Sequence, residues 1–189
     1  MTLVVRSASK AFIVPNPLLS ADKYLHSAAN VLCLNPIMAP AIEVGGGDLF
    51  LETDTPVLAA VAGEADVSAD GRRVSSWAAV RFTRSLEVHA GKKAYVSIKG
   101  LRSEAEGRAP LHSGHSLALN STELDGVEPR LLAALKAPPS LRGDGGDWLQ
   151  AASRLQRYLQ FLADIVQRGA ELVRVNLGGV EYEAWVLEL

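Results

Sequence analysis

The sequence of 189 residues has one cysteine, few aromatic residues and little net charge. Cys33 cannot form an internal disulfide, which fits a reducing cytoplasm and also fits many exported proteins. The 19 basic and 21 acidic residues give a net charge of -2. The sequence therefore lacks the excess of positive charge that is typical of proteins that bind nucleic acid or an anionic membrane. The chain also lacks an apolar run long enough for a signal peptide or for the ~20 residues of a membrane span. We therefore expect a cytoplasmic location.

The first part of the chain is rich in short apolar segments separated by turn residues. Segments such as AFIV, DLFLE and KAYVSIK, between Leu3 and about Leu119, are typical of strands. Asp70-Gly71 predicts a tight hairpin, because glycine reaches positive φ without steric cost. Many short strands at close spacing favour a closed barrel or a sandwich.

One early segment, residues 20–36, has the period of an amphipathic helix. Its apolar stripe consists of Ala21, Leu25, Ala28, Ala29 and Leu32. Asp22, Lys23 and His26 lie off this stripe, and Asn35-Pro36 ends the segment. The sequence therefore predicts a single helix within a region of strands.

The C-terminal part has a different pattern. Residues 128–136 predict a short helix, and the Gly- and Asp-rich residues 140–147 predict a flexible connection. Asp147 is a suitable N-cap for a long amphipathic helix that Gly169 ends. The residues after Gly169 predict a pair of strands joined through 177–179.

A series of short motifs in the first part resembles a known family. In order, these motifs are Ser20-Ala21-Asp22, Ala29-Asn30, Asn35-Pro36, the segment AIEV at 41–44 and the glycines 45–47. The order and spacing are similar to those of biotin-dependent carboxyltransferases, a group with allophanate hydrolase subunit 2, the matching domain of urea carboxylase and one of the 5-oxoprolinase subunits. Residues 48–100 and 110–119 continue the resemblance, with a glycine turn at 62–64 and a strand that ends in Gly100.

The chain also departs from the family pattern. Where family members have a Thr-x-Gln-Asp-x-Gly-Arg-Pro-Gly loop, this sequence has AFIVPNPLL, and the segment LRSEAEGRA after Gly100 is shorter than its family counterpart. The second barrel-like half of the family is largely replaced by a region rich in helix. The resemblance therefore indicates a reduced member.

The resemblance implies a mainly β (α+β) fold, with a cyclophilin-like β-barrel and one N-terminal plug helix that seals the barrel's end. A long helix and a strand pair follow at the C-terminus. We expect three regions: residues 1–122 form the barrel, 123–146 form a short helix and linker, and 147–189 pack on the barrel or complete it.

The implied function is that of an allophanate-hydrolase-subunit-2-like protein acting with a partner subunit on small amide or urea-like compounds. The alternative is a non-catalytic binding subunit that pairs with a protein like allophanate hydrolase subunit 1, or that forms a homo-oligomer. The sequence does not decide whether the chain is an enzyme. It has no biotin-attachment motif and no ATP-binding loop, so biotin or ATP would come only through partner subunits.

The residues that carry the resemblance are also the candidate binding residues: Ser20, Asp22, Tyr24, Asn30 and Glu43. A structural role competes with a catalytic one, because Asp22 suits a helix start and Asn30 could hold a loop backbone through its amide. No catalytic residue is assigned. Cys33 is interpreted as a core thiol, and no metal is expected, because His112 and His115 lack a third ligand nearby.

Overall fold

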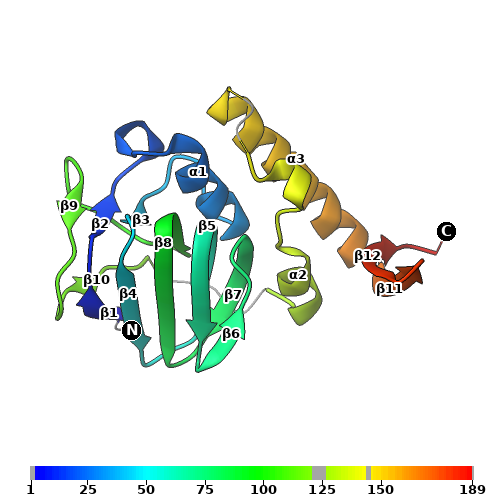
Figure 1. Ribbon diagram of the computed structural model, residues 1–189, viewed down its shortest axis with the longest axis horizontal. Helices are drawn as coiled ribbons and strands as arrows, with labels where there is room; N and C mark the ends of the chain where they lie inside the picture. Colours follow the sequence, from blue (N-terminus) through cyan, green and yellow to red (C-terminus); the bar gives the residue numbers. More distant parts are fainter. Residues whose placement is uncertain (1–2, 121–126, 144–145, 189) are drawn as a thin grey trace.

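The computed structural model describes residues 3–120, 127–143 and 146–188 (Figure 1). The strands of the first part are β1 (Leu3–Ala8), β2 (Ala11–Val14), β3 (Ala41–Val44), β4 (Asp48–Thr53), β5 (Val57–Ala69), β6 (Arg72–Val74), β7 (Ala78–Phe82), β8 (Ser85–Ile98), β9 (Ala109–Pro110) and β10 (Ser116–Leu117). The helical segments are η1 (Pro17–Leu19), α1 (Lys23–Leu32), α2 (Pro129–Ala134), η2 (Pro139–Leu141) and α3 (Trp148–Gln167). A final hairpin consists of β11 (Glu171–Leu177) and β12 (Val180–Val186).

The first part forms one antiparallel sheet of 10 strands that curls into a half-barrel. Strand β8 is its centre, because β5 pairs along one side while β4 and then β3 pair along the other. The path continues through β4 to β1 and β10, and through β3 to β2 and β9. The β5–β6 hairpin turns at Asp70-Gly71, both with positive φ, as the sequence predicts.

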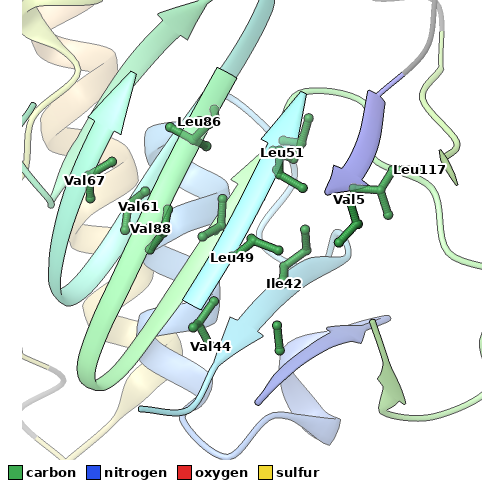
Figure 2. Packing of buried hydrophobic residues seen from close by; sticks show 14 of the residues in the cluster. Val5, Ile42, Val44, Leu49, Leu51, Val61, Val67, Leu86, Val88 and Leu117 are labelled. Atoms are coloured by element: carbon green, nitrogen blue, oxygen red, sulfur yellow. The ribbon is translucent and has the colours of Figure 1, made fainter. Parts of the chain in front are cut away.

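A large apolar cluster fills the concave side of the sheet. The cluster contains side chains from the outer strands β1, β7 and β10 and from the central strands β4 and β8. Examples are Val5, Leu49, Phe82, Val88 and Leu117. Figure 2 shows side chains of this cluster, among them Val5, Leu49 and Val88, on the near side of the strands, with α1 and α3 behind. Burial of this face accounts for the alternation of apolar residues along the strands.

A second apolar cluster covers the convex side, where α1 packs on β5 and β8. Strand β5 has both faces buried here: Val57, Ala59 and Val61 belong to the concave cluster, whereas Leu58 and Ala60 belong to the convex one. Small alanines on the convex face allow the helix to lie close to the strand.

Helix α3 lies over α1 and α2 and completes the convex cluster. Asp147 caps it by accepting hydrogen bonds from the amides of Leu149 and Gln150, each at 3.1 Å. Gly169, with φ +97°, follows its C-cap. The β11–β12 hairpin follows the C-terminal end of α3 (Figure 1).

The predicted mainly β fold, with a short N-terminal helix and a C-terminal helix and strand pair, is confirmed. The structure refines the position of α1, which covers the convex face of the half-barrel because its apolar side matches β5 and β8. The expected boundary at residues 122–123 and part of the expected linker lie outside the described residues. No helix in the described ranges is long and apolar enough to cross a membrane.

Candidate functional site

Three of the candidate residues, Ser20, Asp22 and Glu43, gather around the start of α1, and Asp22 is the N-cap of this helix. The Asp22 Oδ1 atom accepts a hydrogen bond from the Leu25 amide at 2.9 Å, and the Asp22 amide donates to the Tyr95 hydroxyl at 3.0 Å. The carboxylate thus satisfies an amide that the first helical turn leaves without a partner. Asp22 therefore fixes where α1 begins.

Glu43, on β3, is the buried acid of the site, with a side chain only 2% exposed. One carboxylate oxygen, Oε1, lies 2.6 Å from Nη2 of Arg108. The other, Oε2, accepts hydrogen bonds from the Tyr95 hydroxyl at 2.5 Å and the Ala21 amide at 3.2 Å. We call Ala21, Asp22, Glu43, Tyr95 and Arg108 the Glu43 network.

Tyr95 and Arg108 reach Glu43 from different segments. Tyr95 lies directly across from Glu43 in the β3–β8 ladder, and burial, with the Glu43 hydrogen bond as a further cause, raises the pKa of its hydroxyl. The neutral hydroxyl can therefore donate to the carboxylate. Arg108 precedes β9, and its guanidinium lies 3.7 Å from the centre of the Phe12 ring on β2.

His26 is fully buried beside this network, and its ring centre lies 5.5 Å from that of Tyr95. Nε2 lies 2.8 Å from the Ala39 carbonyl oxygen, which can only accept, so Nε2 carries the hydrogen. In the neutral ring Nδ1 then accepts from the Ser20 hydroxyl at 2.5 Å. Burial lowers the pKa of His26 to about 4, so the ring is neutral at pH 7.

Asn30 ties α1 to the loop that follows it and to β8. Its amide donates to the carbonyl oxygens of Ala39 at 2.6 Å and Ile37 at 3.3 Å, and its Oδ1 accepts from the Ser97 hydroxyl at 2.6 Å. Asn35 extends this set by donating to Ser97 and to the Ile98 carbonyl. The Asn30 side chain therefore holds a loop backbone through its amide.

Tyr24 points away from the other candidates. Its hydroxyl donates to the carbonyl oxygen of Leu141, and its ring centre lies 6.2 Å from the Trp77 ring. The structure thus brings Ser20, Asp22 and Glu43 to one end of α1, and places Tyr24 in the convex cluster between α1 and η2.

Chemically, this arrangement stabilises a fold more readily than it performs catalysis. A general base needs an oxygen or nitrogen that can face a substrate. Both Glu43 oxygens already have donors, and the best-defined hollows in the described ranges are lined by residues other than Asp22, Asn30 and Glu43.

The largest of these hollows, about 640 Å³, lies on the sheet near β4, β5 and β8. Its lining includes Asp48 and His89, whose side chains are hydrogen-bonded, and this pairing raises the pKa of His89. Both side chains are more than half exposed, so the pair is screened by solvent.

Cys33 occupies the C-cap of α1 and is fully buried. Its thiol lies 3.5 Å from the Leu58 carbonyl oxygen, and burial raises its pKa to about 12, so it is a core thiol as the sequence indicates. Among the described residues, no three His, Cys, Asp or Glu side chains form a group that could hold a metal ion.

Sequence reasoning missed three members of these networks: His26, Tyr95 and Arg108. His26 lies off the apolar stripe that the sequence predicts for α1, yet the helix is buried nearly all round after Tyr24. Tyr95 had a usable signal, because a polar hydroxyl in the apolar segment AYVSI needs a buried partner. Arg108 had none, because it lies in an irregular segment far from Glu43 in sequence.

Comparison with solved structures shows relatives of this fold. The TTHA0988 protein superposes with a TM-score of 0.54 and 20% identity, over 62% of this chain and 30% of that one. The K. lactis urea amidolyase superposes with a TM-score of 0.53 and 17% identity, over 73% of this chain and 10% of that one. The Kluyveromyces lactis urea carboxylase superposes with a TM-score of 0.54 and 17% identity, over 73% of this chain and 14% of that one. This chain thus spans less than a third of each of these proteins.

Comparison with curated protein sequences gives no match. A family model does match: residues 20–129, more than half of the chain, fit the model described as carboxyltransferase domain, subdomain A and B. This match covers α1, the Glu43 network and the central strands of the half-barrel. The chain therefore belongs to the carboxyltransferase domain family.

Proposed function

We propose that this chain is a non-catalytic binding subunit of a carboxyltransferase-family assembly. Its companion resembles allophanate hydrolase subunit 1, and the assembly acts on small amide or urea-like compounds. Two of the structural relatives are named for urea, which supports that class of compound. Biotin or ATP, where the reaction uses them, is bound by the companion proteins.

The observation that carries the proposal is an uncovered apolar face on the β11–β12 hairpin. The side chains of this face, all more than a third exposed, are Val173, Val175, Leu177, Val180, Tyr182 and Val186. They share one face because Val175 pairs with Tyr182 and Leu177 with Val180 across the ladder. Contiguous exposed apolar patches of this kind mark surfaces that bind other proteins.

The opposite face of the hairpin anchors it to the rest of the protein. Trp185 packs against the convex cluster, and Glu183 lies 3.4 Å from Arg174 and 3.9 Å from Lys136 at the end of α2. A two-stranded hairpin is marginal in water without a further layer. This anchoring thus presents the apolar face outward in a defined orientation, available to a companion.

The Glu43 network supports the non-catalytic part of the proposal. An enzyme of this family must hold a developing oxyanion with free donors and exclude water around it. Here the Arg108 guanidinium, the Tyr95 hydroxyl and the Ala21 amide already contact the Glu43 carboxylate. These donors stabilise the junction of α1 and the sheet.

The test is binding of the purified chain to a purified companion resembling allophanate hydrolase subunit 1 from the same cell, measured by light scattering after gel filtration. We expect a monomer alone and a complex on mixing. Val175→Lys should weaken the complex at least tenfold, whereas Glu181→Lys on the opposite face should leave it intact.

Three results would contradict the proposal. A complex that resists Val175→Lys would show that the hairpin is not the contact. A stable dimer of the chain alone that Val175→Lys dissociates would assign the hairpin to a homo-oligomer. Turnover of a urea or amide compound by the isolated chain would overturn the non-catalytic assignment.

A further inference from the structure

A second surface feature, separate from the hairpin and from the Glu43 network, has the properties of a ligand site. It is a hollow of about 500 Å³ between α1, β5, β8 and the residue after η2. We call it the Trp77 hollow, and its lining residues are Leu25, Gly63, Glu64, Trp77, Lys92, Lys93 and Arg142. Its volume lies within the roughly 300–1,000 Å³ of small-molecule sites.

The backbone around the hollow is unusual at two places. Gly63 has φ +116°, and a Cβ atom there would lie 2.5 Å from the Lys93 carbonyl oxygen, so only glycine fits. The β5–β8 register shifts between Gly63 and Ala65, which forms a bulge at the edge of the hollow. Bulges are frequent next to binding sites, because they redirect the neighbouring side chains.

Trp77 has φ +62°, a left-handed conformation that is costly for a bulky residue. The conformation is held from both sides, since the Trp77 amide donates to the Val61 carbonyl at 2.6 Å and its carbonyl accepts from the Ala137 amide at 2.8 Å. Such strain concentrates at ligand sites, where it positions a side chain. Here it places the indole in the wall of the hollow.

The charge of the hollow is positive, although the chain as a whole has a net charge of -2. Lys92 lies 3.7 Å from Glu64, and both side chains are largely exposed, so this ion pair is weak. In the described ranges neither Lys93 nor Arg142 has a carboxylate partner. Arg142 is oriented by its Nε, which donates to the Ala137 carbonyl at 3.0 Å, and its guanidinium carbon lies 6.0 Å from the Trp77 ring centre.

We propose that the Trp77 hollow binds a small, flat organic carboxylate. The carboxylate would pair with Arg142 and Lys93, because the planar guanidinium of Arg142, whose Nη groups contact no carboxylate within the described ranges, matches its two oxygens. The flat apolar part of the ligand would lie against the Trp77 indole and Leu25. A bare inorganic anion would leave this apolar wall in contact with water.

The test uses benzoate as the probe, with the indole signals of the full chain followed by ¹H–¹⁵N NMR. We expect the Trp77 signal to shift with a Kd on the order of 1 mM, as a ligand of this size allows. The neutral analogue benzamide should bind at least tenfold more weakly. Inorganic phosphate should leave the Trp77 signal in place.

Two variants locate the site. Arg142→Gln should weaken benzoate binding about tenfold, whereas Arg157→Gln, an exposed residue of α3, should leave it unchanged. An unchanged backbone spectrum of each variant establishes that it is folded. Equal binding of benzamide and benzoate, an equal response to phosphate, no effect of Arg142→Gln, or no shift at 20 mM benzoate would each overturn the proposal.

Discussion

Strands β5 and β11 differ both in apolar pattern and in environment: residues 57–62 of β5 are continuously apolar, whereas in β11 Val173, Val175 and Leu177 alternate with polar residues. In β5, the residues Val57–Ala62 are buried on both faces, one against the concave cluster and the other against α1 and its neighbours. In β11, Val173, Val175 and Leu177 face outward, and only the other side of the hairpin contacts the protein. Apolar side chains therefore stabilise the fold in β5, whereas in β11 they leave a surface available.

The difference shows where the chain tolerates change. The interior of the half-barrel is closely packed, so most substitutions of its buried residues should lower the free energy of unfolding. The hairpin should tolerate substitution on its outer face at little cost in stability, with the effect appearing in binding. Constrained and permissive positions can therefore be compared in matched pairs of variants.

The largest effect is expected at Gly63, in the middle of β5. In Gly63→Ala the new Cβ atom would lie 2.5 Å from the Lys93 carbonyl oxygen and 2.9 Å from the Ala94 Cα, in a backbone with φ +116°. We expect a loss of about 3 kcal/mol or more in the free energy of unfolding, measured with urea.

Gly71→Ala is the matched control. Gly71 also has a positive φ, +77°, but a Cβ atom there would meet no other atom within 4 Å. Only the conformational cost of about 1 kcal/mol should remain. Equal losses in the two variants would show that close packing at Gly63 is unimportant.

The next effect is expected at Glu43. Glu43→Gln removes the charge that Arg108 faces and replaces one acceptor oxygen of a side chain that is 2% exposed. We expect a loss of about 2–3 kcal/mol, at the low end for a buried ion pair because Arg108 is 42% exposed and can regain water.

Glu52→Gln provides the comparison for Glu43. Glu52 also contacts an arginine, Arg6, at 2.5 Å, but both side chains are exposed, so the loss should stay below about 1 kcal/mol. A loss at Glu43 as small as that at Glu52 would contradict the structural role of the Glu43 network.

The sequence predicts much of this contrast but not all of it. Strand alternation, Asp70-Gly71, Asp147 and Gly169 are local signals, and the elements that they predict are present because local geometry alone decides them. The Glu43 network depends on Arg108, 65 positions away, and no local pattern encodes that pairing. The continuous apolar run at 57–62 is typical of a strand buried on both faces, but it does not reveal that α1 is the element that covers the convex face.

The third effect is a pH dependence that His26 confers. Its pKa is about 4 in the folded protein and about 6.5 when unfolded, so between these values the unfolded chain binds the extra proton. Stability is therefore highest above pH 6.5 and falls as the pH drops toward 4. We expect roughly 2 kcal/mol less stability at pH 5 than at pH 7.

His26→Gln should remove most of this slope in urea unfolding measured at both pH values. Asp70 does not contribute to this slope, because it changes charge only below pH 5. Despite partial burial, hydrogen bonds from the amides of Ser85, Thr83 and Arg84 lower its pKa to about 2. The exposed His89, with a raised pKa, acts in the opposite direction, because its pairing with Asp48 is lost as the pH rises. A slope that persists in His26→Gln would contradict a buried neutral imidazole.

The smallest effect tests the contrast between β5 and β11 directly, with one substitution made in both strands. Val61→Thr puts a hydroxyl into the concave cluster, where Val61 is 1% exposed, and should cost about 1–3 kcal/mol because the hydroxyl loses water. Val175→Thr, at a side chain that is 38% exposed, should change the unfolding free energy by less than about 0.5 kcal/mol. If Val175→Thr cost as much as Val61→Thr, the hairpin face would be covered by the chain's own residues, and its availability to a companion would be refuted.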